Sequence, residues 1–242
     1  MANPKILIID IETIPNLGYF WRMWDENIGI NQLVEPGRIW GVGWKWLGEK
    51  EATYVDAHIP SRRALMLKAI HKEWSRADAI VSYNGAAFDV PWLMGEFALF
   101  GLAPPPPVPH IDMIRTVKKF KLPSRKLAYV LPHFGCGEKV DTGGFDLWRA
   151  VMAGNKEARL AMGEYCLGDV VGLELLYIKL KSYVQPHPHL GPRGTCGTCG
   201  STKVQRRGVR KTKAFVIQRL QCMDCGGWSD GTRTRIDKVE KA

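Results

Sequence analysis

Hydrophobic positions in the first 185 residues form short continuous runs that alternate with longer stretches of helical spacing. The run from Lys5 to Ile9 predicts a strand that is buried on both faces of a sheet. Strands are also predicted at 39–47, at 53–57 and from Ile80, and helices at 61–74, 90–101 and 155–184. This order of elements predicts a mixed α/β domain that opens with three strands, a helix and a fourth strand.

Two acids follow the first predicted strand. Asp10 and Glu12 are separated by one residue, and because strand side chains alternate, both carboxylates project from the same side. Two carboxylates that project together repel each other unless a cation lies between them. Taken alone, an acid after a strand is more often a cap or part of a solvated turn. The later acidic segments must therefore decide whether this pair binds a metal.

A second acid follows the strand that begins at Ile80. Residues 85–87 are Gly, Ala and Ala, which leave room for a backbone or a nucleotide to approach closely. Asp89 is predicted at the N-cap of the next helix, where it can act as a cap or as a metal ligand. Asn84 and Phe88 offer an amide and a ring to a terminal nucleotide, although Phe88 could equally pack in the core.

The third segment lies within the long predicted helix. Tyr165 and Asp169 are four residues apart, so their side chains share one face of that helix. Tyr165 alone is more often an amphipathic core residue, but an unpaired carboxylate on an apolar face is costly to bury. An apolar stripe continues along the helix and predicts packing on the sheet; its members are Val170, Leu173, Leu176, Tyr177 and Leu180.

Together these segments resemble the DEDD superfamily of exonucleases, in particular the proofreading domain of B-family DNA polymerases and its stand-alone phage and bacterial relatives. The motifs are Asp10-Ile11-Glu12-Thr13, Asn84-x3-Phe88-Asp89 and Tyr165-x3-Asp169. The resemblance covers residues 5–183, with further likeness at Asp112-Met113-Ile114 and Ser124-Arg125-Lys126-Leu127. The histidine branch places a His where this chain has Glu164, so the chain is similar to the tyrosine (DEDDy) branch.

The resemblance implies a ribonuclease H-like fold, with a mixed five-stranded sheet flanked by helices, and a two-metal mechanism. Oxygen-only ligands favour Mg²⁺ or Mn²⁺. By resemblance, Asp10 bridges both ions, Glu12 and Asp169 complete the site that activates water, and Asp89 holds the second ion directly or through water. Tyr165 orients the attacking water rather than removing its proton, which suits a phenol with an ordinary pKa near 10.

The character of the chain changes after residue 185. Residues 185–192 are rich in proline and have no apolar periodicity, which predicts a linker. We therefore place the exonuclease-like domain at 1–185, the linker at 186–193 and a small second domain at 194–242. A domain as small as the second cannot build a sufficient core alone and needs a metal or disulfides.

Two CxxC pairs, Cys196 with Cys199 and Cys222 with Cys225, predict one structural Zn²⁺ in a zinc ribbon. Their spacer of 22 residues is slightly longer than usual and predicts a long hairpin between the pairs. The competing interpretation is a set of disulfides or redox motifs. With four thiolates present, His187 and His189 are not needed as ligands, and Cys136 and Cys166 are predicted to be free thiols.

Positive charge is concentrated in the C-terminal region. Residues 186–242 carry 12 Lys and Arg and 4 Asp and Glu, a net charge of +8 out of +10 for the chain. This imbalance favours contact with a nucleic acid, through the basic residues and through Phe215 and Trp228, over a solubilising face or a protein-docking surface. The nucleic-acid contacts predicted for the whole chain are Thr13, Asn84, Phe88, Lys126, Arg206, Arg207, Arg210, Lys211, Lys213 and Arg219.

Several segments leave alternatives open. Residues 14–36 form an insertion whose four aromatic residues could stack on an unpaired strand or cover a core edge; they are Tyr19, Phe20, Trp21 and Trp24. Residues 104–107 are four prolines and predict a stiff extended connector. Asp112 is predicted as a helix cap or an ion-pair partner, and Lys126 as a phosphate contact or a solvated lysine.

Membrane insertion is not expected, because no apolar run approaches about 18 residues and the N-terminus lacks the features of a signal peptide. We therefore expect a soluble protein in the cytoplasm of a bacterial or phage-infected cell.

The sequence favours a 3′-to-5′ exonuclease that trims single-stranded DNA in replication proofreading or repair, acting in trans with a separate polymerase. A 3′ exoribonuclease is the alternative within the same enzyme class, since no residue that reads a 2′-hydroxyl can be identified. From a different class, the chain could be a non-catalytic nucleic-acid-binding adaptor that uses its zinc ribbon.

Overall fold

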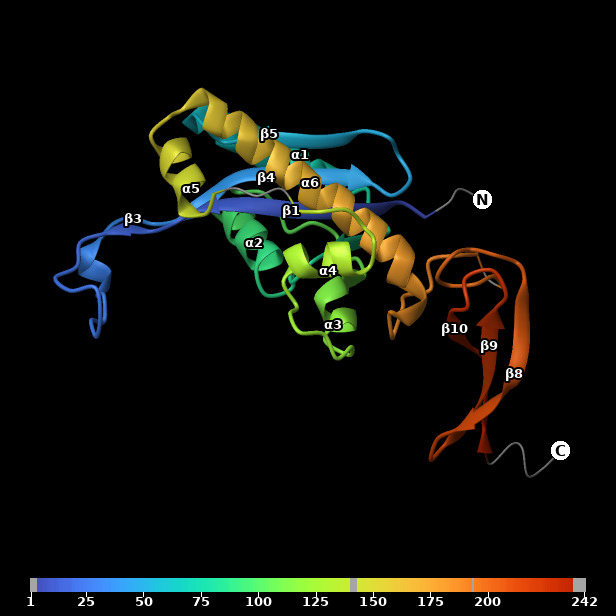
Figure 1. Ribbon diagram of the computed structural model, residues 1–242. Helices are drawn as coiled ribbons and strands as arrows, with labels where there is room; N and C mark the ends of the chain where they lie inside the picture. Colours follow the sequence, from blue (N-terminus) through green and yellow to red (C-terminus); the bar gives the residue numbers. More distant parts are fainter. Residues whose placement is uncertain (1–3, 140–142, 193, 237–242) are drawn as a thin grey trace. The chain divides into compact units, whose positions relative to one another are not determined.

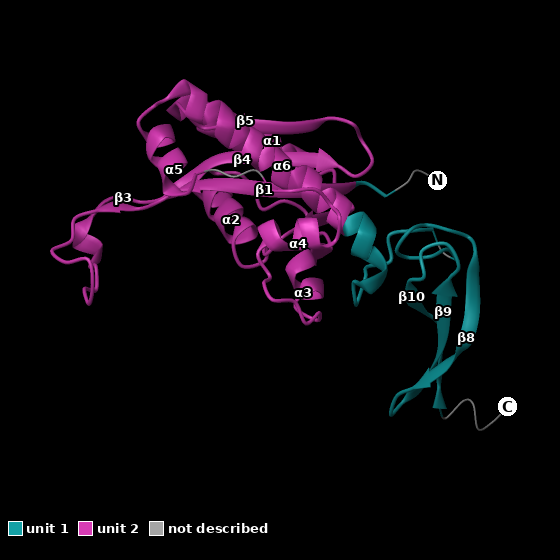
Figure 2. Ribbon diagram, viewed as in Figure 1, with its two compact units in different colours: residues 1–5, 177–242 teal, residues 6–176 magenta. Residues whose placement is uncertain are grey.

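The computed structural model describes residues 4–139, 143–192 and 194–236. The described residues form two compact units, one of residues 6–176 and one of residues 4–5 with 177–236, shown in different colours in Figure 2. The division falls between Leu176 and Tyr177, inside a long helix.

The first unit is built on a mixed five-stranded sheet with the order β5-β4-β1-β6-β7. Its strands are β1 (Ile6–Ile14), β4 (Arg38–Trp46), β5 (Ala52–Asp56), β6 (Ala79–Ser82) and β7 (His110–Asp112). The central strand β1 pairs antiparallel with β4 and parallel with β6, and β7 extends the parallel half. The predicted five-stranded mixed sheet flanked by helices is therefore confirmed.

Helices cover both faces of this sheet (Figure 1). On one face, α1 (Pro60–Trp74) and α2 (Asp89–Leu99) pack over Leu7, Ile9 and Ile11 of β1. On the other face lies α6 (Lys156–Leu180), near α5 (Phe145–Met152), whose Val151 packs with Met162 of α6. The remaining helices are α3 (Met113–Val117), α4 (Leu127–His133) and the 3₁₀ turns η1 (Ile30–Gln32) and η2 (Lys181–Tyr183).

The long helix α6 begins where Asn155 caps it, with Oδ1 accepting a hydrogen bond from the backbone N–H of Ala158 at 2.8 Å. Its apolar stripe is buried along the part that lies in the first unit, since Val170, Leu173 and Leu176 are each at most 1% exposed. Tyr177 and Leu180 are also buried and belong to the second unit. Close packing requires Gly43 in β4, since a Cβ there would lie 2.7 Å from Cys166 Sγ. The helix therefore rests on a strand surface from which a side chain is missing.

One buried ion pair also joins α6 to β4. Lys45 Nζ lies 2.8 Å from Glu174 Oε2, and both side chains are less than 10% exposed. Glu174 Oε1 accepts a hydrogen bond from the backbone N–H of Gly48 at 2.7 Å. Each charge is therefore compensated, as burial of an ion requires.

The insertion after β1 forms a separate two-stranded arm of β2 (Leu17–Gly18) and β3 (Leu33–Glu35), seen as a projection in Figure 1. Its aromatic side chains are exposed by 51% to 92%; they are Tyr19, Phe20, Trp21 and Trp24. The suggestion that these rings cover a core edge is therefore wrong, because they lie in solvent.

In the second unit, β8 (Val204–Lys211), β9 (Phe215–Cys222) and β10 (Trp228–Arg235) form an antiparallel sheet of order β10-β9-β8. The predicted hairpin between the two CxxC pairs is β8 and β9, and the sequence reasoning did not anticipate the third strand. Of the residues that the structure describes, none belongs to a helix both long and apolar enough to cross a membrane.

The buried ion pair between α6 and β4 is expected to contribute to the free energy of unfolding. We expect Glu174→Ala to lower the free energy of unfolding by about 3–5 kcal/mol, because Lys45 is left buried without its partner. The double substitution Lys45→Met with Glu174→Leu removes both charges and is expected to cost less. Urea unfolding can be followed by tryptophan fluorescence, since eight of the nine tryptophans lie within residues 6–176.

The matched control is Glu164→Ala, which removes an exposed acid from the same helix and should change stability by no more than about 0.5 kcal/mol. A loss below about 1 kcal/mol for Glu174→Ala would contradict this role of the pair.

Candidate active site and cysteine cluster

Asp10 and Glu12 lie inside β1 and not after its end, because the strand continues to Ile14. Their partners across the β1–β4 ladder are Gly43 and Gly41, so β4 places no side chain beside either carboxylate. Both acids project toward the α6 side of the sheet, where Cys166 Sγ lies 3.7 Å from Asp10 Oδ2. The two glycines thus let neighbouring side chains approach the strand closely, because a Cβ at Gly43 would lie 2.7 Å from Cys166 Sγ of α6 and a Cβ at Gly41 would collide with the hydroxyl of Tyr54.

Asp89 is tied directly to β1. It is the first residue of α2, with Phe88 at the N-cap, so the predicted N-cap position was wrong by one residue. Asp89 Oδ1 accepts a hydrogen bond from the backbone N–H of Ile11 at 3.1 Å, and the side chain is 3% exposed. The ladder between β1 and β6 ends at Ile8, so Asp89 satisfies a strand donor beyond that ladder.

Asp169 and Tyr165 reach the same place from α6. Asp169 Oδ2 accepts a hydrogen bond from Lys139 Nζ at 2.6 Å, whereas the buried Oδ1 has no hydrogen-bond partner within the described parts of the chain. The ring of Tyr165 packs edge-to-face on Trp148, whose Nε1 donates to the carbonyl of Thr13 at 3.0 Å. Tyr165 is thereby oriented through Trp148 against β1.

Lys139 is a site residue that the sequence reasoning missed. Besides holding Asp169, its ammonium lies 4.5 Å from the centroid of the Tyr165 ring. It lies in an irregular segment after α4, where a single lysine has neither periodicity nor motif to distinguish it. Only the folded chain reveals that this cation faces the acids.

Burial raises the pKa of all four carboxyl groups, and the charges of neighbouring acids add to this for Asp10 and Glu12. Burial, followed by the charges of Asp89, Glu12 and Asp169, raises the pKa of Asp10 well above its ordinary value. Burial and then Asp169 raise the pKa of Glu12 to about 8, and burial raises that of Asp89 to about 7. Burial also raises the pKa of Asp169, although Lys139 opposes the shift. A concentration of hard oxygen donors, one of them unpaired, fits divalent cations.

The predicted nucleotide contacts fall in different places around these acids. Asn84 and Lys126 line one cavity of about 680 Å³, and the backbone N–H of Asn84 donates to Asp112 Oδ1 at 2.7 Å. Asp112 is also the N-cap of α3, as predicted, and accepts from the N–H of Ile114 at 3.3 Å. Lys126 itself is exposed. These contacts hold the turn that precedes Phe88 and Asp89 in a fixed conformation.

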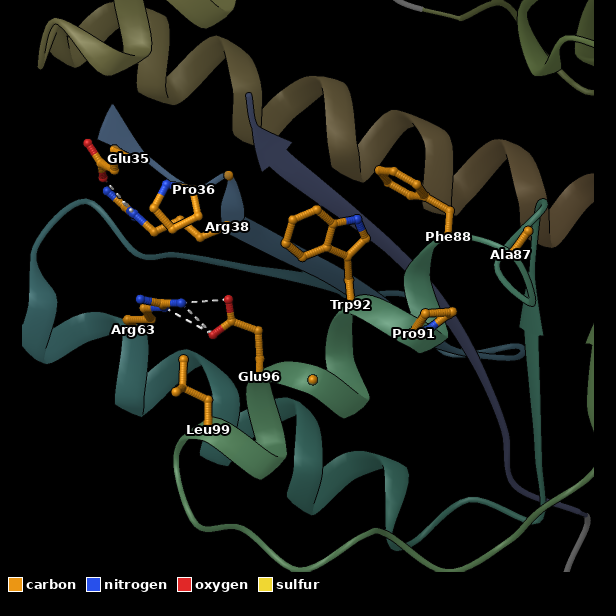
Figure 3. Close-up of a pocket in the computed structure, with 12 residues that line it drawn as sticks. Glu35, Pro36, Arg38, Arg63, Ala87, Phe88, Pro91, Trp92, Glu96 and Leu99 are labelled. Atoms are coloured by element: carbon orange, nitrogen blue, oxygen red, sulfur yellow. Dashed lines mark hydrogen bonds and ion pairs between the residues drawn. The ribbon is translucent and has the colours of Figure 1, made fainter. Parts of the chain in front are cut away.

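Phe88 lines a second cavity, of about 600 Å³, shown in Figure 3. Phe88 is 41% exposed, so the core-packing alternative is wrong. Its ring packs edge-to-face against that of Trp92, with 6.5 Å between the ring centroids. Arg63 and Arg38 enter from other elements. Arg63 donates to the two carboxylate oxygens of Glu96 at 2.6 and 2.8 Å, whereas Arg38 Nε lies 3.6 Å from Glu35 Oε1. The cavity therefore offers two aromatic rings and one loosely paired guanidinium.

The four cysteines of the CxxC pairs form a second candidate metal centre. Their sulfur atoms all lie within 4.8 Å of one another, with 3.7 Å between Cys196 and Cys225 and 3.6 Å between Cys199 and Cys222. These separations are far longer than the roughly 2.05 Å of a disulfide, so the disulfide alternative is wrong. None of these four cysteines is in a disulfide, and the same holds for the buried Cys136 and Cys166. The arrangement can hold a metal.

The two histidines of the predicted linker are engaged elsewhere. His187 Nε2 lies 2.9 Å from the hydroxyl of Tyr177, and the two rings stack. His189 Nε2 lies 3.2 Å from the carbonyl of Thr195. Neither belongs to the cysteine cluster.

The raised pKa values predict how pH affects the metal-free protein. Glu12 has an ordinary pKa of 4.5 and a folded-state pKa of about 8, so the folded state binds more protons between these values. Without Mg²⁺ or Mn²⁺, we expect the free energy of unfolding of the 6–176 unit to fall from pH 5 to pH 8. Glu12→Gln should reduce this fall by a few kcal/mol.

Urea titrations followed by tryptophan fluorescence at several pH values measure this effect. Parallel pH profiles for the wild type and Glu12→Gln would contradict it. Added Mn²⁺ should stabilise the wild type most at pH 8, where the carboxyl groups are ionised and repel one another.

Comparisons with known proteins identify the fold. Residues 30–181, more than half of the chain, match the family model of the RNase H superfamily. No protein of curated function matches the sequence. The family B DNA polymerase from the hyperthermophilic archaeon Pyrobaculum calidifontis is structurally similar, with a TM-score of 0.56 and 18% identity over 75% of this chain. The match covers 25% of the polymerase, so this chain spans about a quarter of its length. The family match shows that the chain belongs to the RNase H superfamily.

Proposed function

We propose that this protein is a two-metal 3′-to-5′ exonuclease of the tyrosine type that removes nucleotides from single-stranded DNA. The observation that carries the proposal is the convergence of Asp10, Glu12, Asp89 and Asp169 from three separate segments, with one buried carboxylate oxygen unpaired. Membership of the RNase H superfamily and similarity in fold to a family B DNA polymerase support it.

The four carboxylates would hold two Mg²⁺ or Mn²⁺ ions. When bound, such ions lower the pKa of a water and stabilise the charge that develops on the leaving 3′ oxygen. Asp10 would be one of the ligands, because it lies close enough to the other three acids for their charges to raise its pKa. Asp89 can offer its second oxygen while Oδ1 keeps the hydrogen bond from Ile11.

Tyr165 and Lys139 are the two neighbours of Asp169 that we expect to assist the reaction. Burial raises the pKa of Tyr165 to about 12, against the opposing effect of Lys139, so its phenol stays protonated and can orient a water without removing its proton. Lys139 holds Asp169 Oδ2 and thereby fixes the direction of Oδ1. The same lysine offsets part of the negative charge before a cation or substrate enters.

A surface on which the terminal base of a nucleic acid can stack lies next to Asp89. Phe88 immediately precedes Asp89, and with Trp92 it offers exposed aromatic surface on which a base can stack. Stacking tolerates any base, which suits an enzyme that trims ends without regard to sequence. We propose proofreading or repair, in trans with a separate polymerase, as the setting of this activity.

For the cysteine cluster we propose one structural Zn²⁺. Four thiolates close a tetrahedral site and leave no position open for catalysis. The metal would replace much of the hydrophobic core that so small a sheet lacks.

Labelled oligonucleotides test the proposed reaction. We expect 5′-labelled single-stranded DNA to give a ladder that shortens from the 3′ end with Mg²⁺ or Mn²⁺ and no ladder with a chelator. RNA of the same sequence, run in parallel, should be cut more slowly. Internal cuts, or activity that survives Mg²⁺ removal, would overturn the proposal.

Single substitutions test the roles of the site residues. Asp169→Asn should lower kcat by at least about 100-fold, because a charged ligand is lost. Tyr165→Phe should lower kcat by about 10- to 100-fold while leaving stability nearly unchanged, because water is misplaced. The controls are Asp146→Asn on the exposed surface of α5 and Tyr129→Phe in α4, which should leave kcat within about 2-fold. Equal effects in the controls and the site variants would contradict these roles.

Metal analysis tests the cysteine cluster. The purified protein should contain one zinc per chain, and Cys222→Ser should lose most of it. Cys136→Ser removes a buried thiol outside the cluster and should retain the zinc. Iron in place of zinc, or unchanged metal content in Cys222→Ser, would contradict the assignment.

A further inference from the structure

Pairing in the small sheet sorts its basic residues onto two faces. Side chains directly opposite one another in a ladder share a face. In β9, Phe215, Ile217 and Arg219 point to one face because strand side chains alternate. Arg210 of β8 pairs with Ile217 and therefore lies on the same face. The residues of β10 on this face include Trp228, Asp230, Arg233 and Arg235.

We call the surface formed by Arg210, Phe215, Arg219, Trp228, Arg233 and Arg235 the arginine face. The opposite face has a different character. It carries Arg206 and Lys211 of β8 beside aliphatic and uncharged residues of β9, which are Val216, Gln218 and Leu220. The basic residues that were grouped together from the sequence therefore lie on two different faces of the sheet. Arg233 and Arg235, which the sequence analysis did not include, lie on the arginine face.

On the arginine face, two arginines lie over aromatic rings. Arg219 Cζ is 4.3 Å from the ring centroid of Trp228, and Arg233 Cζ is 3.6 Å from that of Phe215. Neither guanidinium donates a hydrogen bond to another side chain or carbonyl among the described residues. A guanidinium that lies over a ring keeps the N–H groups at its edge available for a phosphate, and its outer plane for a base.

The remaining charges leave this face strongly positive. Arg210 donates to Asp230 at 3.1 Å, and the hydrogen bond from Arg210 helps to hold the pKa of Asp230 below its usual range. Arg219 and Arg233 also lower that pKa through their charges. Asp230 thus neutralises Arg210, and the charges of Arg219 and Arg233 remain beside the two aromatic rings.

The spacing of the two stacks suits an extended strand. Phe215 and Arg219 are four residues apart in β9, which corresponds to about 13 Å along the sheet. Alternating rings and cations fit a polymer that alternates flat bases with phosphates, and they fit an unpaired strand because a duplex hides its base faces. An acidic protein would use the arginines but would not need the rings.

We propose that the arginine face binds single-stranded nucleic acid, with bases stacked at the Arg219–Trp228 and Arg233–Phe215 pairs and phosphates at the arginine edges. The identity of the strand as substrate rests on the proposed exonuclease function. Because the two units belong to one chain, a strand held here is present at high local concentration for the carboxylate site.

The test compares two variants of the full-length protein that lose the same charge. Arg219→Gln with Arg233→Gln alters the arginine face, and Arg206→Gln with Lys211→Gln alters the opposite face. Binding of a fluorescein-labelled oligothymidylate is measured by anisotropy at several salt concentrations, with Ca²⁺ in place of Mg²⁺. Zinc content is measured for both, to verify that the ribbon is intact.

We expect the arginine-face variant to bind at least about 10-fold more weakly and to lose about 1.4 from the slope of log K against log salt, at about 0.7 for each phosphate contact. The opposite-face variant should change affinity by less than about 3-fold. Equal weakening of both variants, or no weakening of the first, would overturn the proposal.

Photo-crosslinking of the unmodified protein gives a result independent of folding in the variants. An oligonucleotide containing 5-iododeoxyuridine should crosslink to Phe215 or Trp228, identified by peptide mass spectrometry. Crosslinks confined to the opposite face, or none within residues 194–236, would overturn the proposal.

Hydrolysis of a short oligonucleotide separates the two claims. If the exonuclease proposal is wrong, no cleavage will be seen, but the crosslinks to the arginine face will still form. Failure of the arginine-face proposal would leave cleavage in place with no dependence of binding on Arg219 or Arg233.

Discussion

Repulsion among four carboxylates in a largely buried space is the constraint on which the rest of the 6–176 unit depends. Glu12, Asp89 and Asp169 are each at most 6% exposed, and the charge of Asp10 is coupled to all of them. Without a cation, Glu12 and Asp89 hold protons at a pH where free acids do not. Such an arrangement costs stability and is explained by what it can bind.

The main chain is arranged to tolerate this cost. The two glycines opposite Asp10 and Glu12 keep β4 from crowding the acids, and a hydrogen bond from Ile11 fixes Asp89. Farther along the same contact between β4 and α6, the paired charges of Lys45 and Glu174 hold the helix in position. The carboxylates therefore project from packed helices and strands, and only Lys139, which holds Asp169, comes from an irregular segment.

Much of this arrangement could be predicted from the sequence, since strand alternation placed Asp10 with Glu12 and helical spacing placed Tyr165 with Asp169. The sequence could not reveal Lys139, because a lone lysine in an irregular segment has no pattern. It grouped Arg206 with Arg219, which strand pairing assigns to opposite faces. The sequence also did not decide whether the aromatic residues of the β2–β3 arm are buried or exposed, because hydrophobicity alone does not tell whether a partner surface exists. Contacts between distant segments supply what local pattern cannot.

Anomalous X-ray scattering from crystals soaked in Mn²⁺ with a short single-stranded oligonucleotide tests the central claim most directly. The account predicts two manganese peaks about 3.5–4 Å apart, coordinated by oxygens of Asp10, Glu12, Asp89 and Asp169. Crystals with the oligonucleotide bound but no manganese in contact with these four carboxylates would contradict it.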